Sequence, residues 1–469
     1  MAPPPPPLLM VAAAIATTLL LSTLSLLVQA TSPQHSQLCN NNNNNNPSST
    51  SSGSTTIPVF HAYGPCSPLR GKGPSTTSFA DFLLGISASD KSRLQYLTSL
   101  ATATPRPKRS FVPIASGSKL LQTPTYLVRA SLGTPPQSLL VALDTSSDAA
   151  WFPSSACVGC PQSDSAYAPA SSSTYLPVPC GSPQCSQVPN PSCSPSPPAA
   201  AACSFNLTYG SSIVVASLAQ DSLSLASDTI AGYTFGSLVQ ATGTSVPPQG
   251  LLGLGRGPLS FLSQSKPLYS STFSYCLPSF RSLNFSGTLR LGPSGQPARI
   301  KTTPLLTNPR RSSLYYVALN RIRVGRRYAN VPPGALAFDP ATGAGTIFDS
   351  GTMFTRLVAP AYAAVREEFR RSVNGTVTTL GGFDTCYDGP VAAPAITFEF
   401  DGMRVTLPAE NVMIHSSSGS LSCLAMASAP DNVNSVLNVI ASMQQQNHRV
   451  LFDVANGKVG VARETCTGA

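Results

Sequence analysis

Residues 142–147 read ALDTSS, and residues 347–352 read IFDSGT. In each stretch an apolar pair precedes an aspartate, which is followed by a hydroxyl residue, a small residue and a second hydroxyl residue. The two aspartates, Asp144 and Asp349, lie about 200 positions apart, which is roughly the length of one domain. The repetition therefore predicts two similar β lobes, each presenting one carboxylate.

The sequence around these stretches is typical of strands and turns. From residue 123 onward short apolar runs alternate with turns, and 45 Pro and 34 Gly interrupt helices and supply tight turns. A second apolar segment occurs at residues 251–255 and again at 439–443, downstream of each aspartate. One helix is expected at 360–372, where Tyr362, Val365 and Phe369 fall on one face. The sequence favours a mostly β protein.

The repeated aspartates indicate two carboxylates that work together. Two carboxylates facing each other across a pseudo-twofold axis cannot both ionise cheaply, so they share one proton and titrate as a coupled pair. We expect Asp144 and Asp349 to lie within reach of that proton, with no side chain between them. The candidate supporting residues are the hydroxyl residues beside the aspartates: Thr145, Ser147, Ser350 and Thr352.

Such a pair can activate a water molecule without a metal, a cofactor or a covalent intermediate. One carboxylate accepts a proton from the water, and the proton held by the other polarises the scissile carbonyl. The sequence contains no GxSxG nucleophile elbow, no HExxH zinc helix and no GxGxxG dinucleotide turn. We therefore expect no metal site and no cofactor.

The N-terminus predicts a secretory signal peptide at residues 1–30. Residues 8–30 are apolar and almost uncharged, and they end in a small-x-small tripeptide. The alternatives are an uncleaved membrane anchor and an organelle transit peptide. A transit peptide is disfavoured because it is rich in arginine, and the first arginine here is Arg70. We expect a secreted protein with no stable membrane association after cleavage.

Residues 31–110 read as a prosegment. An asparagine run at 40–46 and a Ser/Thr-rich stretch to residue 56 cannot pack a core. A short helix is expected at 79–100, and the sequence PRPKR at 105–109 is an exposed site of the kind that processing proteases cut. Half of the net charge of +10 lies in this segment, and no basic stripe carries interleaved aromatics, so we expect no nucleic-acid partner.

Twelve cysteines in a chain with a signal peptide predict an oxidising compartment and a disulfide framework. Cys157 and Cys160 could be half of a zinc site, but no histidine accompanies them, which favours a bridged loop. The ten disulfide candidates are Cys157, Cys160, Cys180, Cys185, Cys193, Cys203, Cys276, Cys386, Cys423 and Cys466. Candidate glycosylation sites, which would agree with secretion, are Asn206, Asn284 and Asn374.

From residue 123 to 464 the chain resembles the plant pepsin-like, nepenthesin-like group of aspartic endopeptidases. Residues 144–147, followed by Trp151, are similar to the first active-site segment of this family. Residues 205–210 resemble its flap strand, and the six-cysteine stretch at 157–203 resembles its plant-specific insert. Residues 250–260 and 444–453 also match segments of the group. Aspartic proteases are the standard example of two carboxylates that share one proton.

The resemblance implies an all-β, bilobal pepsin-like fold with the active-site cleft between the lobes. It implies an N-terminal lobe at 111–300, with the first catalytic Asp144, the flap and the insert, and a C-terminal lobe at 301–469 with the second catalytic Asp349. Tyr209 would close over the substrate, and Trp151 would support the flap. By the same likeness, Cys276 would pair with Cys466 and Cys386 with Cys423. The implied protein is a monomeric endopeptidase of the apoplast or cell wall, acting on protein or peptide substrates.

Two positions and one short segment depart from the family pattern. Ser146 and Ala441 stand where glycine is usual, and residues 211–213 replace the Asp-Gly turn that commonly follows the flap tyrosine. A Cβ at positions 146 and 441 is expected to crowd the backbone that supports the carboxylates, loosen the geometry and lower the rate.

Two further hypotheses stay open. The same scaffold could serve a catalytically weak or inactive binding protein, like the plant xylanase inhibitors, although such proteins typically have damaged aspartate pairs. Some plant relatives lie in chloroplasts and bind DNA, which makes a chloroplast location a third, less favoured hypothesis.

Overall fold

The structure is a computed structural model that describes residues 55–61, 79–102, 126–163, 166–193, 201–279, 287–309, 311–416, 419–431 and 435–466. The expected signal peptide, the candidate processing site at 105–109 and the candidate glycosylation site Asn284 lie outside the described residues. Within the described residues, no helix is both long and apolar enough to cross a membrane.

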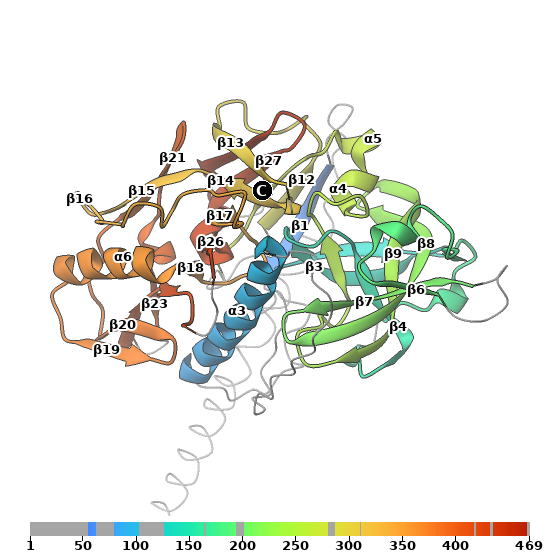
Figure 1. The fold of residues 1–469 in the computed structure, drawn as a ribbon, viewed down its shortest axis with the longest axis horizontal. Coiled ribbons are helices and arrows are strands. Elements are labelled where there is room, and N and C mark those ends of the chain that lie inside the picture. Colours follow the sequence, from blue (N-terminus) through green and yellow to red (C-terminus); the bar gives the residue numbers. More distant parts are fainter. Residues whose placement is uncertain are drawn as a thin grey trace, which may run out of the picture. The chain divides into compact units, whose positions relative to one another are not determined.

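The N-terminal lobe is built from long antiparallel strands (Figure 1). Its elements are β2 (Tyr126–Leu132), β3 (Gln137–Asp144), β4 (Trp151–Val158), η2 (Pro169–Ser171), β5 (Leu176–Pro177), η3 (Cys185–Gln187), β6 (Pro191–Cys193), β7 (Cys203–Tyr209), β8 (Ser212–Leu225), β9 (Asp228–Thr242), β10 (Leu251–Gly253), α4 (Phe261–Gln264) and α5 (Lys266–Tyr269). Strand β3 ends at Asp144, and β10 runs parallel to it with Leu252 opposite Leu143. Strand β4 then pairs antiparallel with β10 at Trp151.

The C-terminal lobe repeats this arrangement. Its elements are β14 (Arg311–Val317), β15 (Leu319–Val324), β16 (Arg327–Tyr328), β17 (Gly345–Phe348), β18 (Thr355–Leu357), α6 (Ala359–Ser372), β19 (Val377–Leu380), β20 (Phe383–Asp388), β21 (Ile396–Phe400), β22 (Met403–Thr406), η4 (Ala409–Asn411), β23 (Met413–His415), β24 (Leu421–Leu424), β25 (Met426–Ser428), β26 (Leu437–Ile440) and α7 (Ser442–Gln445). Strand β17 ends just before Asp349, and β26 runs parallel to it with Val439 opposite Ile347. Strand β18 pairs antiparallel with β26 at Arg356. The two repeated motifs of the sequence are therefore neighbours in both lobes, and α6 forms where a helix was expected.

A set of strands from distant parts of the chain joins the two lobes. These are β1 (Thr55–His61), β11 (Thr272–Cys276), β12 (Gly287–Leu291), β13 (Lys301–Asn308), β27 (His448–Asp453) and β28 (Lys458–Arg463). Strand β11 pairs with β27, which pairs with β28, and β28 pairs with β13. Strand β1 pairs with both β12 and β2. Its Ile57 and Val59, which directly follow the Ser/Thr-rich stretch, are buried in the core, whereas Thr56 within that stretch is exposed.

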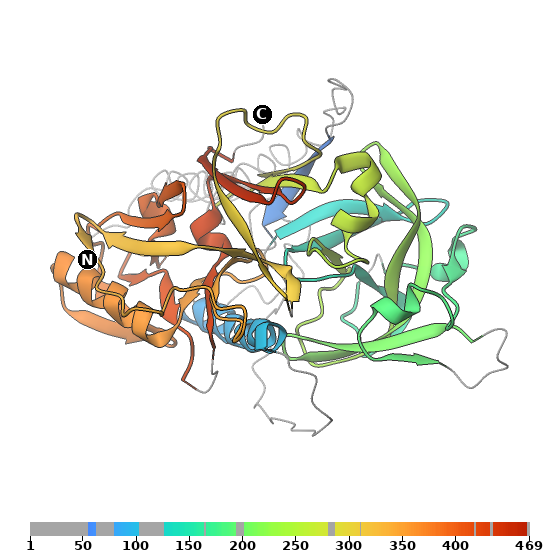
Figure 2. The same ribbon diagram turned by 45° about the horizontal axis from the view of Figure 1, so that its top comes forward.

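Helix α3 (Phe79–Thr102) lies between the two lobes in both views (Figures 1 and 2). It forms where the sequence predicted a helix, and it contacts β7 of the N-terminal lobe and β26 of the C-terminal lobe. Leu94 and Leu97 join the buried cluster around Ile347 and Val439, while Leu83 packs into a second cluster with Phe354. Burial of this apolar face holds α3 across the two aspartate strands.

Candidate active site

The two aspartates lie on matching turns at the ends of buried strands. Asp144 is the last residue of β3, and Asp349 directly follows β17; both side chains are fully buried. The backbone of each turn is tied to the parallel neighbouring strand. Leu254 N–H donates to the carbonyl of Asp144 at 2.7 Å, and Asp349 N–H donates to the carbonyl of Ile440 at 3.1 Å.

Thr145 and Ser350 hold the two turns together. Ser350 N–H donates to Thr145 Oγ1 at 3.0 Å, and Thr145 N–H donates to Ser350 Oγ at 3.2 Å. Each of the two residues donates its backbone N–H to the side-chain hydroxyl of the other, so the contact is pseudo-twofold symmetric. The predicted supporting residues thus fix the two carboxylates relative to each other.

The hydroxyl three positions after each aspartate donates to its carboxylate. Ser147 Oγ lies 2.9 Å from Asp144 Oδ2, and Thr352 Oγ1 lies 2.6 Å from Asp349 Oδ2. In addition, Ser146 N–H donates to Asp144 Oδ1 at 2.8 Å.

The two departures from glycine are accommodated. The Ser146 side chain is a further hydrogen-bond donor to the carboxylate, because its Oγ lies 3.0 Å from Asp144 Oδ1. Ala441 has φ −89° and ψ 172°, an extended conformation that any residue adopts, and its N–H donates to Thr355 Oγ1 at 3.1 Å. The expected loosening of the backbone at these positions is not seen.

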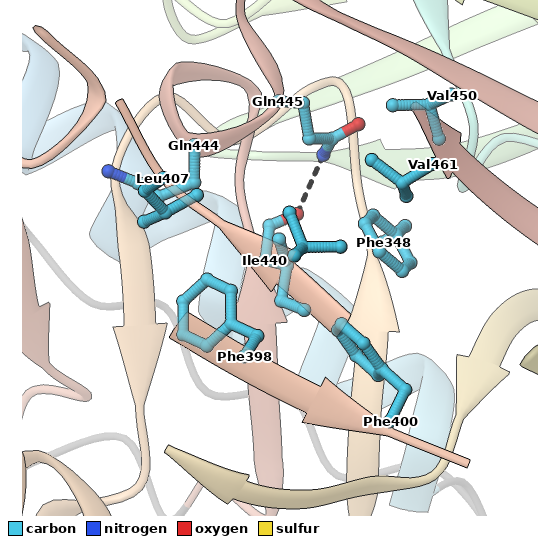
Figure 3. Close-up of a pocket in the computed structure, with 10 residues that line it drawn as sticks. Phe348, Phe398, Phe400, Leu407, Ile440, Gln444, Gln445, Val450 and Val461 are labelled. Carbon is cyan, nitrogen blue, oxygen red and sulfur yellow. Dashed lines mark hydrogen bonds between the residues drawn. The ribbon is translucent and has the colours of Figure 1, made fainter. Parts of the chain in front are cut away.

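A buried glutamine is hydrogen-bonded to the backbone of the second turn. Gln445 Nε2 donates to the carbonyl of Asp349 at 3.2 Å and to that of Ile440 at 2.7 Å, and Tyr275 donates its hydroxyl proton to Gln445 Oε1. Figure 3 shows Gln445 beside a cavity of about 10 Å³ lined mainly by apolar side chains, among them Phe348. This volume is about that of one water-sized sphere, so the cavity is a packing gap in the lobe and not a ligand site.

Arg93 of α3 lies between the two carboxylates. Its Nη2 is 2.5 Å from Asp144 Oδ1 and 2.9 Å from Asp349 Oδ1, and its Nη1 is 2.7 Å from Asp144 Oδ2. The side chain is 6% exposed. A single guanidinium nitrogen therefore bonds both aspartates.

Arg93 and Asp144 shift each other's pKa. Burial alone would raise the pKa of the Asp144 carboxyl, but Arg93 and the donors from Ser146 and Ser147 hold it below its ordinary value. Burial alone would likewise lower the pKa of Arg93, but the two carboxylates hold it well above its ordinary value. The expectation that no side chain lies between the aspartates is thus wrong for the chain with α3 in place.

Tyr209 covers the site from the N-terminal lobe. It ends β7, and β7 and β8 form a hairpin whose two-residue turn begins at Gly210, with φ 56°. The Tyr209 ring lies 5.1 Å from Trp151 and 5.4 Å from the guanidinium carbon of Arg93. Burial and the neighbouring Asp144 raise the pKa of Tyr209 well above its ordinary value. The tyrosine and tryptophan assigned to the flap by resemblance therefore contact each other, and the tyrosine lies against the arginine between the two aspartates.

Asp90, one turn before Arg93, is bonded to the backbone after the second turn. Its two carboxylate oxygens accept from Met353 N–H and Phe354 N–H, each at 2.8 Å. Neither Asp90 nor Arg93 was predicted from the sequence as a site residue. The signal was present, since both charged residues fall on the apolar stripe of the predicted helix, between Leu83 and Leu97.

The remaining candidates are placed as follows. Among the described residues there are five disulfides: Cys157–Cys160, Cys180–Cys193, Cys185–Cys203, Cys276–Cys466 and Cys386–Cys423. Cys157 and Cys160 thus bridge each other within one loop. Asn206 and Asn374 are exposed. Among the residues that the structure describes, no group of three or more His, Cys, Asp or Glu side chains could hold a metal ion.

Comparison with known proteins agrees with this geometry. The family models Xylanase inhibitor N-terminal and Xylanase inhibitor C-terminal match residues 126–293 and 314–463. Aspartyl protease AED3 of Arabidopsis thaliana is 50% identical over 88% of this chain and 92% of its own length. Aspartyl protease 25 of Oryza sativa subsp. japonica is 48% identical over 84% and 92%. Aspartic proteinase nepenthesin-1 of Nepenthes gracilis is 34% identical over 73% and 78%.

Solved structures with the same fold are more distant in sequence. Conglutin gamma, a basic 7S globulin from lupine seeds, has a TM-score of 0.58 and 20% identity, covering 72% of this chain and 90% of its own. Basic 7S globulin from soybean has a TM-score of 0.58 and 22% identity, covering 72% and 93%. At this identity the likeness concerns the fold, which is the all-β, bilobal pepsin-like fold. The chain belongs to the plant pepsin-like aspartic protease family and is an aspartic-type endopeptidase.

Proposed function

We propose that this protein hydrolyses peptide bonds with a water molecule activated between Asp144 and Asp349, and that α3 keeps it inactive until the prosegment is removed. The observation that carries the proposal is the contact of both carboxylates with one guanidinium nitrogen of Arg93. This contact supports a pair close enough to share one proton once the guanidinium is gone.

The catalytic cycle begins when α3 leaves and a water molecule occupies the position of the guanidinium. The ionised carboxylate accepts a proton from the water while the water oxygen attacks the peptide carbonyl carbon, and the other carboxyl gives its proton to the carbonyl oxygen. The first carboxyl then protonates the amide nitrogen, the C–N bond breaks, and one hydroxyl of the tetrahedral intermediate returns its proton to the second carboxylate. The products are a carboxylic acid and an amine, and the pair again holds one proton.

The surrounding residues orient this chemistry. Ser147 and Thr352 donate to the carboxylate oxygens, which fixes the directions in which the remaining lone pairs point. Tyr209, at the tip of the β7–β8 hairpin, would lie over a bound substrate and exclude solvent. In the precursor Arg93 of α3 contacts both aspartates and Tyr209, so α3 and an extended substrate would compete for one place.

The chain upstream of the lobes supports a precursor. Arg93 and Asp90 both lie before the candidate processing site at 105–109. Cleavage there would leave α3 held to the lobes only by noncovalent contacts. Five disulfides and the exposed Asn206 and Asn374 support secretion into an oxidising compartment, with glycosylation, and an extracellular location.

The test is a proteolysis assay on the purified, processed protein. We expect it to cleave a denatured protein substrate, and we expect Asp144→Asn and Asp349→Asn each to lower kcat by about a thousandfold or more, because either change removes one member of the pair. Asp401→Asn, at an exposed turn between β21 and β22, is the matched control and should leave the rate unchanged. Cleavage that survives either change at the pair would overturn the assignment.

The second candidate function is a catalytically weak or inactive binding protein on the same scaffold. The two matching family models carry the name xylanase inhibitor, which favours it. Both aspartates and their hydroxyl donors are present, which favours the protease. Capture of a glycoside hydrolase by the processed protein, together with no proteolysis between acidic and neutral pH, would support the binding protein.

A further inference from the structure

A second buried cation lies further along α3, in the C-terminal lobe. Arg356 is the central residue of β18, seven positions after Asp349, and it is 2% exposed. Its Nη2 donates to Ser87 Oγ at 3.0 Å and to the Ser87 carbonyl at 3.4 Å, and its Nη1 donates to the Ser428 carbonyl at 3.3 Å. Within the described part of the chain its Nε is buried without a hydrogen-bond partner.

Most of the hydrogen-bond acceptors of Arg356, and its counter-charge, come from α3. Ser87 and Asp90 are both helix residues, and Asp90 is the carboxylate whose charge acts on the guanidinium. Removal of α3 would leave the Ser428 carbonyl as the acceptor that remains in place. Without the helix the guanidinium would face the opened cleft with no counter-charge, so the cleft left behind would favour an anion at this point.

The other charged groups near Arg356 do not fill that role. Asp384 lines the same cavity but forms ion pairs with Arg366 at 2.6 Å and with Arg370 at 3.6 Å. Asp431, also at this cavity, is exposed to solvent. Among its described residues the lobe therefore has no carboxylate dedicated to Arg356.

The register of α3 gives an approximate separation between this cation and the aspartate pair. Arg93 reaches the pair, and Ser87, six residues earlier on the helix, reaches Arg356. Six residues of α-helix span about 9 Å, and an extended peptide advances about 3.3 Å per residue. A substrate with its scissile bond at the pair would thus bring a side chain two or three residues away to Arg356.

There is room for such a side chain. A cavity of about 430 Å³ lies beside Arg356, lined by Leu84 and Ser87 of α3 and by Tyr362, Gly382 and Ser428 of the lobe. Its helix wall would leave with α3. Met353 N–H and Phe354 N–H, which now donate to Asp90, would become available at the same time. An incoming carboxylate could take over the acceptor role that Asp90 has in the precursor.

We propose that Arg356 is a specificity-determining residue that selects substrates with an aspartate or glutamate two or three residues from the scissile bond. The proposal rests on the proposed function, since it assumes that α3 is removed and that an extended peptide takes its place.

The test compares internally quenched peptides that differ only by glutamate or glutamine at each position around the scissile bond. We expect the processed wild-type protein to cleave a peptide with glutamate two or three residues from the scissile bond at least tenfold faster in kcat/KM than its glutamine counterpart. Arg356→Gln should bring that ratio close to one. Arg404→Gln, which removes an exposed arginine on β22 of the same lobe, should leave it unchanged. A wild-type ratio near one at every position, or a preference that survives Arg356→Gln, would overturn the proposal.

Two further measurements separate this proposal from its premise. Arg356→Lys keeps the cation, so it should retain part of the preference if Arg356→Gln fails to fold; loss of the whole preference in a folded Arg356→Lys protein would count against the proposal. Cleavage of glutamine peptides without any acidic preference would refute the specificity and leave the protease intact. If no peptide is cleaved, the proposed function fails, and the role of Arg356 is then tested by the dissociation constants of the same peptides. The glutamate peptide should still bind at least tenfold tighter than its glutamine counterpart. Equal binding would overturn the role of Arg356.

Discussion

Replacing Arg93 with glutamine removes the guanidinium that bonds both aspartates but leaves the apolar face of α3 intact. Breaking a buried ion pair by removing one partner typically costs about 3–5 kcal/mol. The lower end applies here, because the two released carboxylates can take up a shared proton and so relieve part of the penalty. A loss of about 3 kcal/mol in α3 docking corresponds to a roughly hundredfold larger fraction of open precursor.

The assay uses full-length secreted precursor in which Arg109→Gln blocks the candidate processing site. We expect the Arg93→Gln precursor to hydrolyse a quenched peptide roughly a hundredfold faster than the Arg93 precursor. Lys91→Gln removes a partly exposed cation from the same helix and should not change the rate. If the Arg93→Gln precursor were no more active than its parent, the guanidinium would not be what keeps the site closed.

Three other predictions follow from the contacts described above. Burial raises the pKa of Asp90 to about 6, above its ordinary value of 3.8, so Asp90 takes up a proton more readily when α3 is docked. Protonation of Asp90 therefore favours docking of α3 increasingly as pH falls from 7 to 4, by up to about 3 kcal/mol. Asp90→Asn should lose this dependence, and a pH-independent ratio of α3 hydrogen-exchange protection between wild type and variant would contradict it. Thr145→Val leaves the buried Ser350 N–H without its acceptor and should lower the free energy of unfolding by about 1–3 kcal/mol in urea; an unchanged midpoint would show that the inter-lobe contact adds no stability. Replacing Cys276 and Cys466 together with serine opens a loop with a sequence separation of 190 and should cost up to about 5 kcal/mol in the same measurement, whereas a loss under about 1 kcal/mol would contradict the chain-entropy argument.

Much of the fold could be predicted because its signals are local. The repeated motifs around Asp144 and Asp349 predicted two matching turns, and the paired apolar segments at 251–255 and 439–443 became β10 and β26, each parallel to an aspartate strand. Periodicity likewise predicted α6 and α3. In each case a few neighbouring residues determine the structure.

What was missed depends on contacts between residues far apart in the chain. Strand β1 lies at the end of a Ser/Thr-rich stretch, and its identity as a strand comes from β2 and β12, which are distant in sequence. Arg93 lies 51 positions before Asp144 and 256 before Asp349, so no local pattern connects them. The sequence predicted that α3 is a helix, but only the folded lobes show that its buried face meets two carboxylates and a second arginine.

The most direct test of the central claim is a double-mutant cycle on kcat for the processed protein, with Asp144→Asn, Asp349→Asn and the two changes combined. If the two carboxylates act as one catalytic unit, each single variant loses about a thousandfold or more, and the double variant is no slower than the slower single variant. Losses that multiply in the double variant, or a single variant that keeps the wild-type rate, would show that the two aspartates do not share the reaction.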